Sequence, residues 1–202
     1  MPSVEAKPSP PMWSPLCVLT SEGDSRVGFV TPFTAREVGD LLVERGWLLA
    51  GRESGTDGAQ QAWLKRAADL LGPHAADRAA LTDLLALVFH YDAAALLREP
   101  AGQAVLVREG SRDVIRELAN RVLDTDTIDS DRFKEIINAM KAALPQRSRE
   151  LLHPVRFALA GRAGQGELDR VILLLDSAAN LEFAVCVKGT RQRMLEFCAA
   201  LD

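Results

Sequence analysis

The stretch from Arg147 to Leu175 constrains the fold most, because its proline, glycines and apolar residues are spaced as in two consecutive helices. Pro154 suits the first turn of a helix, and Gly161 suits the left-handed position that follows a helix. Beyond the glycines, apolar residues recur at the i, i+3, i+4, i+7 positions of one helical face: Leu168, Val171, Ile172 and Leu175. The sequence therefore predicts a helical hairpin with its turn at Gly164 and Gly166.

Helical spacing recurs through most of the remaining chain, and we expect an all-α fold with two helical subdomains, residues 34–124 and 130–202. Thr34 and Glu37 have the spacing of a capping box and should begin the first helix. An acidic segment, residues 124–131, should link the subdomains. Further helix starts are expected at capping residues and prolines: Asp92, Pro100, Ser111 and Thr190. In the last helix, the residues expected to face inward are Met194, Leu195, Cys198 and Leu201.

Residues 1–33 differ in composition from the helical part. Five prolines lie within residues 1–15 and predict a disordered lead-in. Residues 16–20 and 26–30 are apolar and flank a turn, so they are typical of the two short strands of a β-hairpin. A lone hairpin is marginally stable in water and would need to pack against the helices.

The first helix of the predicted hairpin carries a recognisable set of residues: Leu152, Pro154, Arg156, Ala158, Leu159 and Gly161. Followed by a glycine-containing turn and an apolar helix, this set resembles the Leu-x-Pro-x-Arg-x-Ala-Leu-Thr-Gly signature near the C-terminus of bacterial glutamyl-tRNA synthetases. The resemblance to the helical anticodon-binding domain of these class I enzymes extends from about Thr34 to the end of the chain. The chain departs from the family at two places. It has Ala160 where the family usually has threonine, and Gln165-Gly166 where the family has Gly-Pro.

The resemblance implies that the second subdomain binds the anticodon stem and loop of a glutamate tRNA. Candidate tRNA contacts on and around the hairpin are basic or histidine side chains: Lys141, Arg147, Arg149, His153, Arg156 and Arg162. Two further candidates, His74 and Arg78, stand where the family has an Arg-Pro-Arg type sequence. Guanidinium groups match phosphate oxygens in geometry. The same arginines could equally form a solvated helix face paired with Glu150 and Glu167.

No catalytic, cofactor or metal site is expected in this chain. The His-x-Gly-His-type and Lys-x-Ser-Lys-type sequences, with which class I synthetases activate an amino acid, do not occur in it. Residues 124–131 lack the glycine and closing glutamate of a calcium loop, and the histidines have no partner at zinc-ligand spacing. The glycines of residues 161–166 match neither a P-loop nor a dinucleotide fingerprint. ATP and glutamate would therefore bind a synthetase catalytic domain or subunit outside this chain, which is a second expected partner.

Charge and composition narrow the classes of function. The net charge of −4 argues against an indiscriminate nucleic-acid binder, yet residues 132–170 hold eight basic and four acidic residues. The three cysteines form no Cys-x-x-Cys pair, and no segment resembles a membrane span or a secretory signal. These features favour the cytoplasm. Two functions remain open: the tRNA-binding module of a glutamyl-tRNA synthetase, or a synthetase-derived protein-interaction or scaffold domain that no longer binds tRNA.

Overall fold

The computed structural model describes residues 33–51, 58–125 and 127–201, and within these ranges all regular structure is helical. The prediction of an all-α fold is confirmed. The helices, in chain order, are α1 (Ala35–Glu44), α2 (Gly58–Leu71), the short 3-10 helix η1 (Gly72–His74), α3 (Arg78–Phe89), α4 (Ala93–Arg98), α5 (Pro100–Leu106), α6 (Ser111–Leu123), α7 (Ser130–Ala143), α8 (Ser148–Ala160), α9 (Glu167–Ala179) and α10 (Thr190–Leu201). The predicted β-hairpin of residues 16–30 lies outside the described residues.

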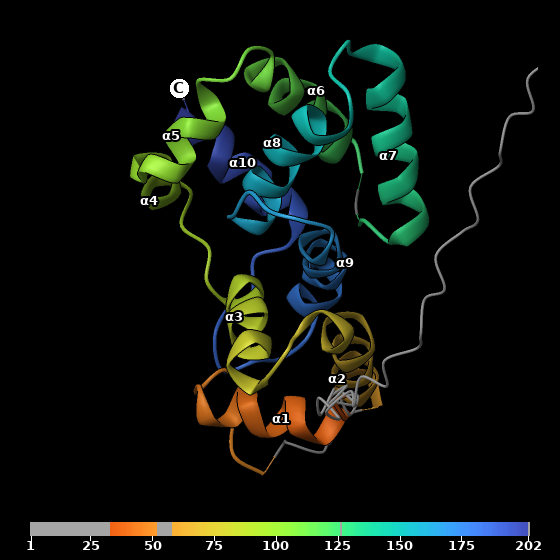
Figure 1. Ribbon diagram of the computed structural model, residues 1–202. Coiled ribbons are helices and arrows are strands. Elements are labelled where there is room, and N and C mark those ends of the chain that lie inside the picture. Colours follow the sequence, from red (N-terminus) through yellow and green to blue (C-terminus); the bar gives the residue numbers. More distant parts are fainter. Residues whose placement is uncertain (1–32, 52–57, 126, 202) are drawn as a thin grey trace, which may run out of the picture.

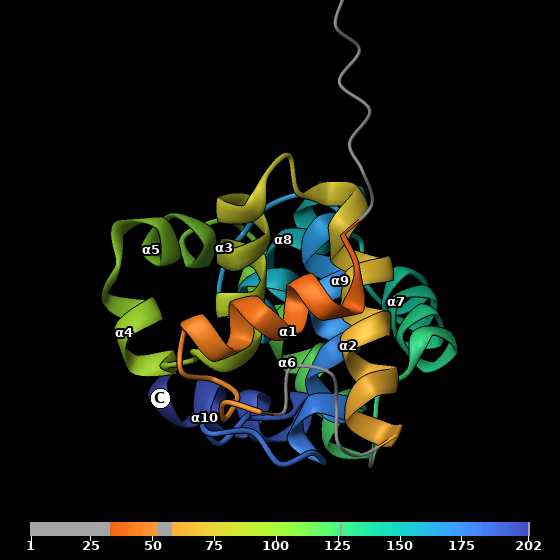
Figure 2. The same ribbon diagram turned by 90° about the horizontal axis from the view of Figure 1, so that it is seen from below.

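Helix α9 connects the two ends of the molecule. Helices α1, α2 and α3 form one end, and α4 to α8 together with α10 form the other (Figure 1). Helix α9 packs against α2 and α3 on one side of this division and against α8 and α10 on the other, and it passes behind α1 when the molecule is seen from the α1 end (Figure 2). Because it is surrounded, α9 buries eight of its residues between Leu168 and Ala178.

Local signals set several helix ends as the sequence predicts. Thr34 and Glu37 form the reciprocal hydrogen bonds of a capping box at the start of α1. Asp129 ends the acidic linker by accepting the backbone N–H groups of Asp131 and Arg132, which caps α7. Gly161 has φ +79° and ends α8 in the left-handed conformation. The predicted hairpin is therefore confirmed as α8 and α9, which pack against each other.

The predicted start of α8 at Pro154 is wrong. The helix begins six residues earlier, at Ser148, and Pro154 lies inside it. A proline has no N–H group, so it removes one backbone hydrogen bond within the helix. The loss is offset by burial, because Leu151 and Val155 on either side of the proline are fully buried in the core.

Helices α6 and α10 start where expected, but Ser111 and Thr190 are their first helical residues and not the capping residues before them, and one buried face also differs from the prediction. Gly110, with φ +75°, is the residue that precedes α6, and Ser111 is already helical. Thr190 is the first residue of α10, and its hydroxyl bonds the carboxylate of Asp176 at 2.7 and 2.8 Å. In α10 the inward residues include Arg193 and Phe197, each 0% exposed, whereas Leu195 is 50% exposed. From the sequence we expected Leu195 to face inward and Arg193 to face solvent, because arginine is ordinarily found on the surface.

No helix in the described ranges is both long and apolar enough to cross a membrane.

Candidate nucleic-acid interface

The turn between α8 and α9 is held in shape by Arg156. Its guanidinium donates from Nε and NH2 to the two carboxylate oxygens of Asp169, each at 2.7 Å, and from NH1 to the carbonyl of Gly164 at 2.9 Å. Arg156 is 7% exposed and the Asp169 side chain 26% exposed, so this is a partly buried, two-pronged ion pair. It joins α8 to both the turn and the first part of α9. The arrangement fixes the backbone of residues 161–166 and uses all the charge of Arg156 inside the protein.

Arg162 is presented by that braced turn. It follows Gly161, whose left-handed conformation directs the chain away from α8, and its side chain is exposed. It makes no ion pair or hydrogen bond with any other described residue. An unpaired guanidinium on a rigid turn is suited to an external anion, because little conformational freedom of the backbone is lost on binding.

The N-terminal half of α8 carries a second basic cluster, centred on His153. The imidazole is 6% exposed. Arg149, one turn earlier, donates from Nε to His153 Nε2 at 3.0 Å, and NH1 of Arg108 lies 3.3 Å from His153 Nδ1. Burial lowers the pKa of His153, and the positive charges of Arg149, Arg108 and Arg156 lower it further. His153 therefore stays neutral in the cluster while the two arginines carry the charge.

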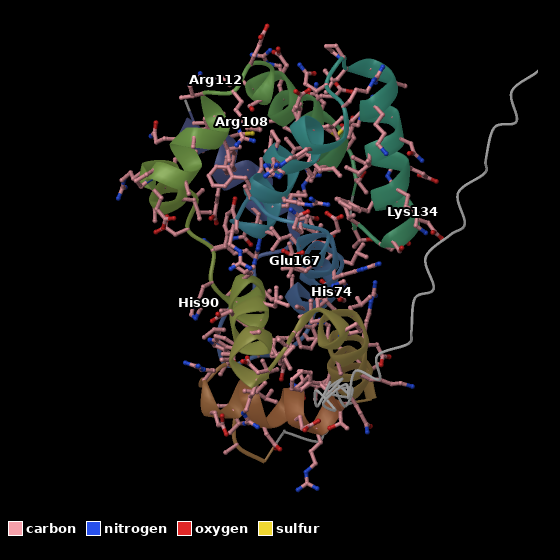
Figure 3. The ribbon with its side chains drawn as sticks, in the orientation of Figure 1. His74, His90, Arg108, Arg112, Lys134 and Glu167 are labelled. Atoms are coloured by element: carbon pink, nitrogen blue, oxygen red, sulfur yellow. The ribbon has the colours of Figure 1, made fainter. Side chains whose placement is uncertain are left out.

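Arg108 reaches α8 because the turn between α5 and α6 packs closely on the chain leading into α8. A Cβ atom at Gly110 would lie 1.9 Å from Nε2 of Gln146, so the Gln146 side chain lies directly against the bare glycine, whose φ of +75° is rarely adopted by other residues. Arg108 and Arg112 lie near each other where α5 gives way to α6 (Figure 3). The close approach places an arginine from a distant part of the sequence beside His153.

Arg147 and Lys141 lie at the adjoining α7–α8 connection, and both are exposed. Arg147 donates from NH1 to the carbonyls of Lys141 at 2.8 Å and Leu144 at 3.4 Å, so its guanidinium satisfies the C-terminal end of α7. The ammonium group of Lys141 has no partner among the described residues. These two side chains therefore add positive charge at the connection that leads into α8.

His74 and Arg78 occupy different elements from the other candidates. His74 is the exposed last residue of η1, and Arg78 begins α3. Arg78 forms an ion pair with Glu44 of α1 at 2.7 Å, with both side chains half-exposed. The predicted candidates thus fall into three places: the braced turn, the His153 cluster with the α7–α8 connection, and the η1–α3 connection.

Two buried polar residues that support the hairpin were missed by the sequence analysis. Arg193 donates to the carbonyls of Val88, Leu159 and Lys188 at 2.7 to 2.9 Å, and its guanidinium lies over the ring of Tyr91. Burial lowers the pKa of Arg193 to about 10, so the group stays charged at neutral pH. No sequence signal identifies it, because its three acceptors come from distant backbone segments.

Asp176 is the other such residue. Its carboxylate accepts the backbone N–H groups of Ile128 and Thr190, both at 2.6 Å, and the hydroxyl of Thr190. It therefore fastens the acidic linker and the start of α10 to α9. No group of acidic, cysteine and histidine side chains in the described ranges is arranged to hold a metal ion.

The comparison with protein families identifies the domain to which this hairpin belongs. The family described as the anticodon binding domain matches residues 34–181, which include α1 to α9 and the braced turn. No curated protein and no solved structure matches the chain. The family match spans well over half of the 202 residues. On this match, and on the helical fold that accompanies it, the chain belongs to the anticodon binding domain family.

Proposed function

We propose that the chain binds the anticodon stem and loop of a tRNA as the tRNA-binding part of an aminoacyl-tRNA synthetase, and that its substrate is a glutamate tRNA. The observation that carries the proposal is the family match over residues 34–181, which takes in the turn braced by Arg156. The choice of glutamate rests on the resemblance of the α8 sequence to glutamyl-tRNA synthetases. We place the protein in the cytoplasm, where such an enzyme works.

The two arginines at the braced turn have different roles in this proposal. Arg156 is a positioning residue, because its charge is taken up by Asp169 and its side chain is buried. Arg162 is the contact residue, because it is exposed at the surface of the same turn. A phosphate or base of the anticodon loop would meet Arg162 and the backbone of residues 161–166. Amino-acid activation is assigned to a catalytic domain outside this chain, since the sequence lacks the motifs for it.

A gel-shift titration tests the proposal. We expect glutamate tRNA to bind with an affinity that falls steeply with salt, and a tRNA with an exchanged anticodon to bind more weakly. Arg162→Ala should weaken binding several-fold and reduce the salt slope by about one. The matched control is Arg36→Ala, which removes an exposed arginine from α1, a helix that carries none of the candidate contacts.

Two outcomes would contradict the proposal. The first is no binding of any tRNA at low salt. The second is binding that does not depend on the anticodon and loses no more with Arg162→Ala than with Arg36→Ala. Recovery of a synthetase subunit without RNA, together with the first outcome, would favour the alternative in which the domain is a protein-interaction scaffold.

A further inference from the structure

The His153 cluster has more hydrogen-bond donors than it can satisfy. A neutral imidazole offers one acceptor nitrogen and one N–H group, and an arginine offers only donors. Both ring nitrogens of His153 face a guanidinium, at 3.0 Å for Arg149 and 3.3 Å for Arg108. In either tautomer, one guanidinium N–H therefore points at a ring N–H. A protonated ring would leave no acceptor at all, in keeping with the lowered pKa of His153.

Arg108 and Arg149 also have no carboxylate partner among the described residues, and their printed side-chain contacts are with His153. Five other arginines in the described ranges do pair with aspartate or glutamate, at 2.5 to 3.2 Å: Arg78, Arg116, Arg121, Arg132 and Arg156. Glu109 and Glu150 are sequence neighbours of the cluster, but no ion pair joins either of them to it within the described structure. Two positively charged guanidinium groups thus flank a buried, neutral histidine. The described residues offer the pair no carboxylate oxygen as a hydrogen-bond acceptor.

We propose that Arg108, Arg149 and His153 form a phosphate-binding site that receives a backbone phosphate of the bound tRNA. A phosphate supplies several acceptor oxygens and negative charge, which are what the cluster lacks. Both arginines are exposed, so the group can approach from solvent. The inference deepens the proposed function, on which it rests, by adding a contact outside the signature hairpin turn.

The position of the site along α8 fits an extended nucleic-acid backbone. Arg149, His153 and Arg156 recur at i, i+4 and i+7, so they lie on one face of the helix. At a rise of about 1.5 Å per residue, Arg149 lies roughly 10 Å from Arg156 along the helix axis. Arg156 in turn braces the turn that carries Arg162. One strand of tRNA could therefore meet both the turn and the phosphate site.

The first test is the salt dependence of tRNA binding by the full chain. In Arg108→Gln/Arg149→Gln the charges are lost while most of each side-chain stem is kept. We expect roughly tenfold weaker binding of glutamate tRNA near 0.1 M salt, and a salt slope smaller by about one, as for the loss of one phosphate contact. Two controls are Arg36→Ala, distant from the site, and Arg112→Ala, an exposed arginine nearby. Circular dichroism establishes that each variant is folded.

The second test uses inorganic phosphate and the NMR resonances of the His153 ring. Phosphate should shift these resonances saturably in the wild type and raise the pKa of His153, because a bound anion stabilises the imidazolium. It should do neither in the double variant. A purely structural role for the cluster predicts no response to phosphate.

The outcomes separate this inference from the proposed function. If the wild type binds tRNA and the double variant binds as tightly as the two controls, the phosphate site is refuted and the function stands. If the wild type binds no tRNA but phosphate shifts His153, the function and the tRNA ligand are refuted, and the phosphate site stands. If phosphate leaves His153 unchanged, the site is refuted whatever tRNA does.

Discussion

The two ends of α8 use the same residue type for different purposes. Near the C-terminal end, Arg156 is 7% exposed and its guanidinium is fully taken up by Asp169 and Gly164. Near the N-terminal end, Arg149 is exposed and bonds only the neutral ring of His153. The difference teaches that an arginine of this helix can bind a ligand only where no carboxylate of the protein already pairs with it. The first arginine therefore holds the hairpin together, and the second keeps its charge for a partner.

The largest expected effect is at the C-terminal end of α8. Arg156→Met should lower the free energy of unfolding by about 2 to 4 kcal/mol, because Asp169 loses both of its charged donors and Gly164 loses its own. Urea denaturation followed by circular dichroism measures the change. In a double-mutant cycle, Arg156→Met with Asp169→Leu should cost less than the sum of the two single changes. If Arg156→Met lowered the free energy of unfolding by less than about 0.5 kcal/mol, Arg156 would be no more structural than Arg149, and the contrast between the two ends of α8 would be wrong.

The next effect concerns the residue that ends α8. Gly161→Ala should cost about 1 to 2 kcal/mol, because φ is +79° and an added Cβ would lie 3.3 Å from Cδ1 of Leu96. Gly166→Ala is the matched control, since φ there is −65° and nothing lies within 4 Å of an added Cβ. The same denaturation experiment compares them. Equal costs for the two substitutions would show that the left-handed cap is not what shapes the turn.

A smaller effect is expected from pH at the N-terminal end. Burial and the neighbouring arginines lower the pKa of His153 in the folded state. Since the unfolded chain then binds the proton more tightly, the contribution of His153 to stability is present above its unfolded pKa and is lost as the pH falls through and below that value. His153→Gln should therefore make the free energy of unfolding less sensitive to pH between about 7.5 and 5.5, given an unfolded pKa of about 6.5. His74→Gln, at an exposed residue, is the control, and an equal response in both variants would contradict the assignment.

The smallest effect on stability is expected for Arg149→Ala. We expect a change within about 0.5 kcal/mol, because the side chain is exposed and its loss relieves repulsion around His153. Thermal unfolding and tRNA binding, measured on the same sample, separate an effect on stability from an effect on affinity. Arg149→Ala should weaken tRNA binding while the melting temperature hardly moves. A large loss of stability would instead make Arg149 a structural residue like Arg156.

Local sequence signals predicted the helices but not how polar residues inside the fold are used. The capping box at Thr34, the left-handed end at Gly161 and the buried stripe of α9 follow from spacing alone, because each depends on residues within two turns of one another. The start of α8 was misplaced, since the helical preference of Pro154 was outweighed by burial of its neighbours. The inward side of α10 was misplaced because Arg193 finds its acceptors on distant segments.

In the candidate site, too, the sequence identified individual residues but not the contacts between distant segments. The sequence identified Arg149, His153 and Arg156 as candidate contacts on and around the hairpin, although the helix was expected to begin only at Pro154. It could not identify Arg108 as a neighbour, because Arg108 and His153 are 45 residues apart and are brought together by the packing of α5 and α6 against α8. Nor could it pair Arg156 with Asp169 when Glu150 and Glu167 were nearer candidates along the chain.

By itself, the sequence determined that this chain is helical, that residues 147–175 form a helical hairpin, and that this hairpin resembles an anticodon-binding element. These properties depend on hydrogen bonds and apolar spacing between residues close in sequence. Only the tertiary structure decided which charged side chains pair with other groups of the protein and which remain exposed on its surface. That decision depends on desolvation and on acceptors brought from distant segments, and neither is visible until the chain is packed.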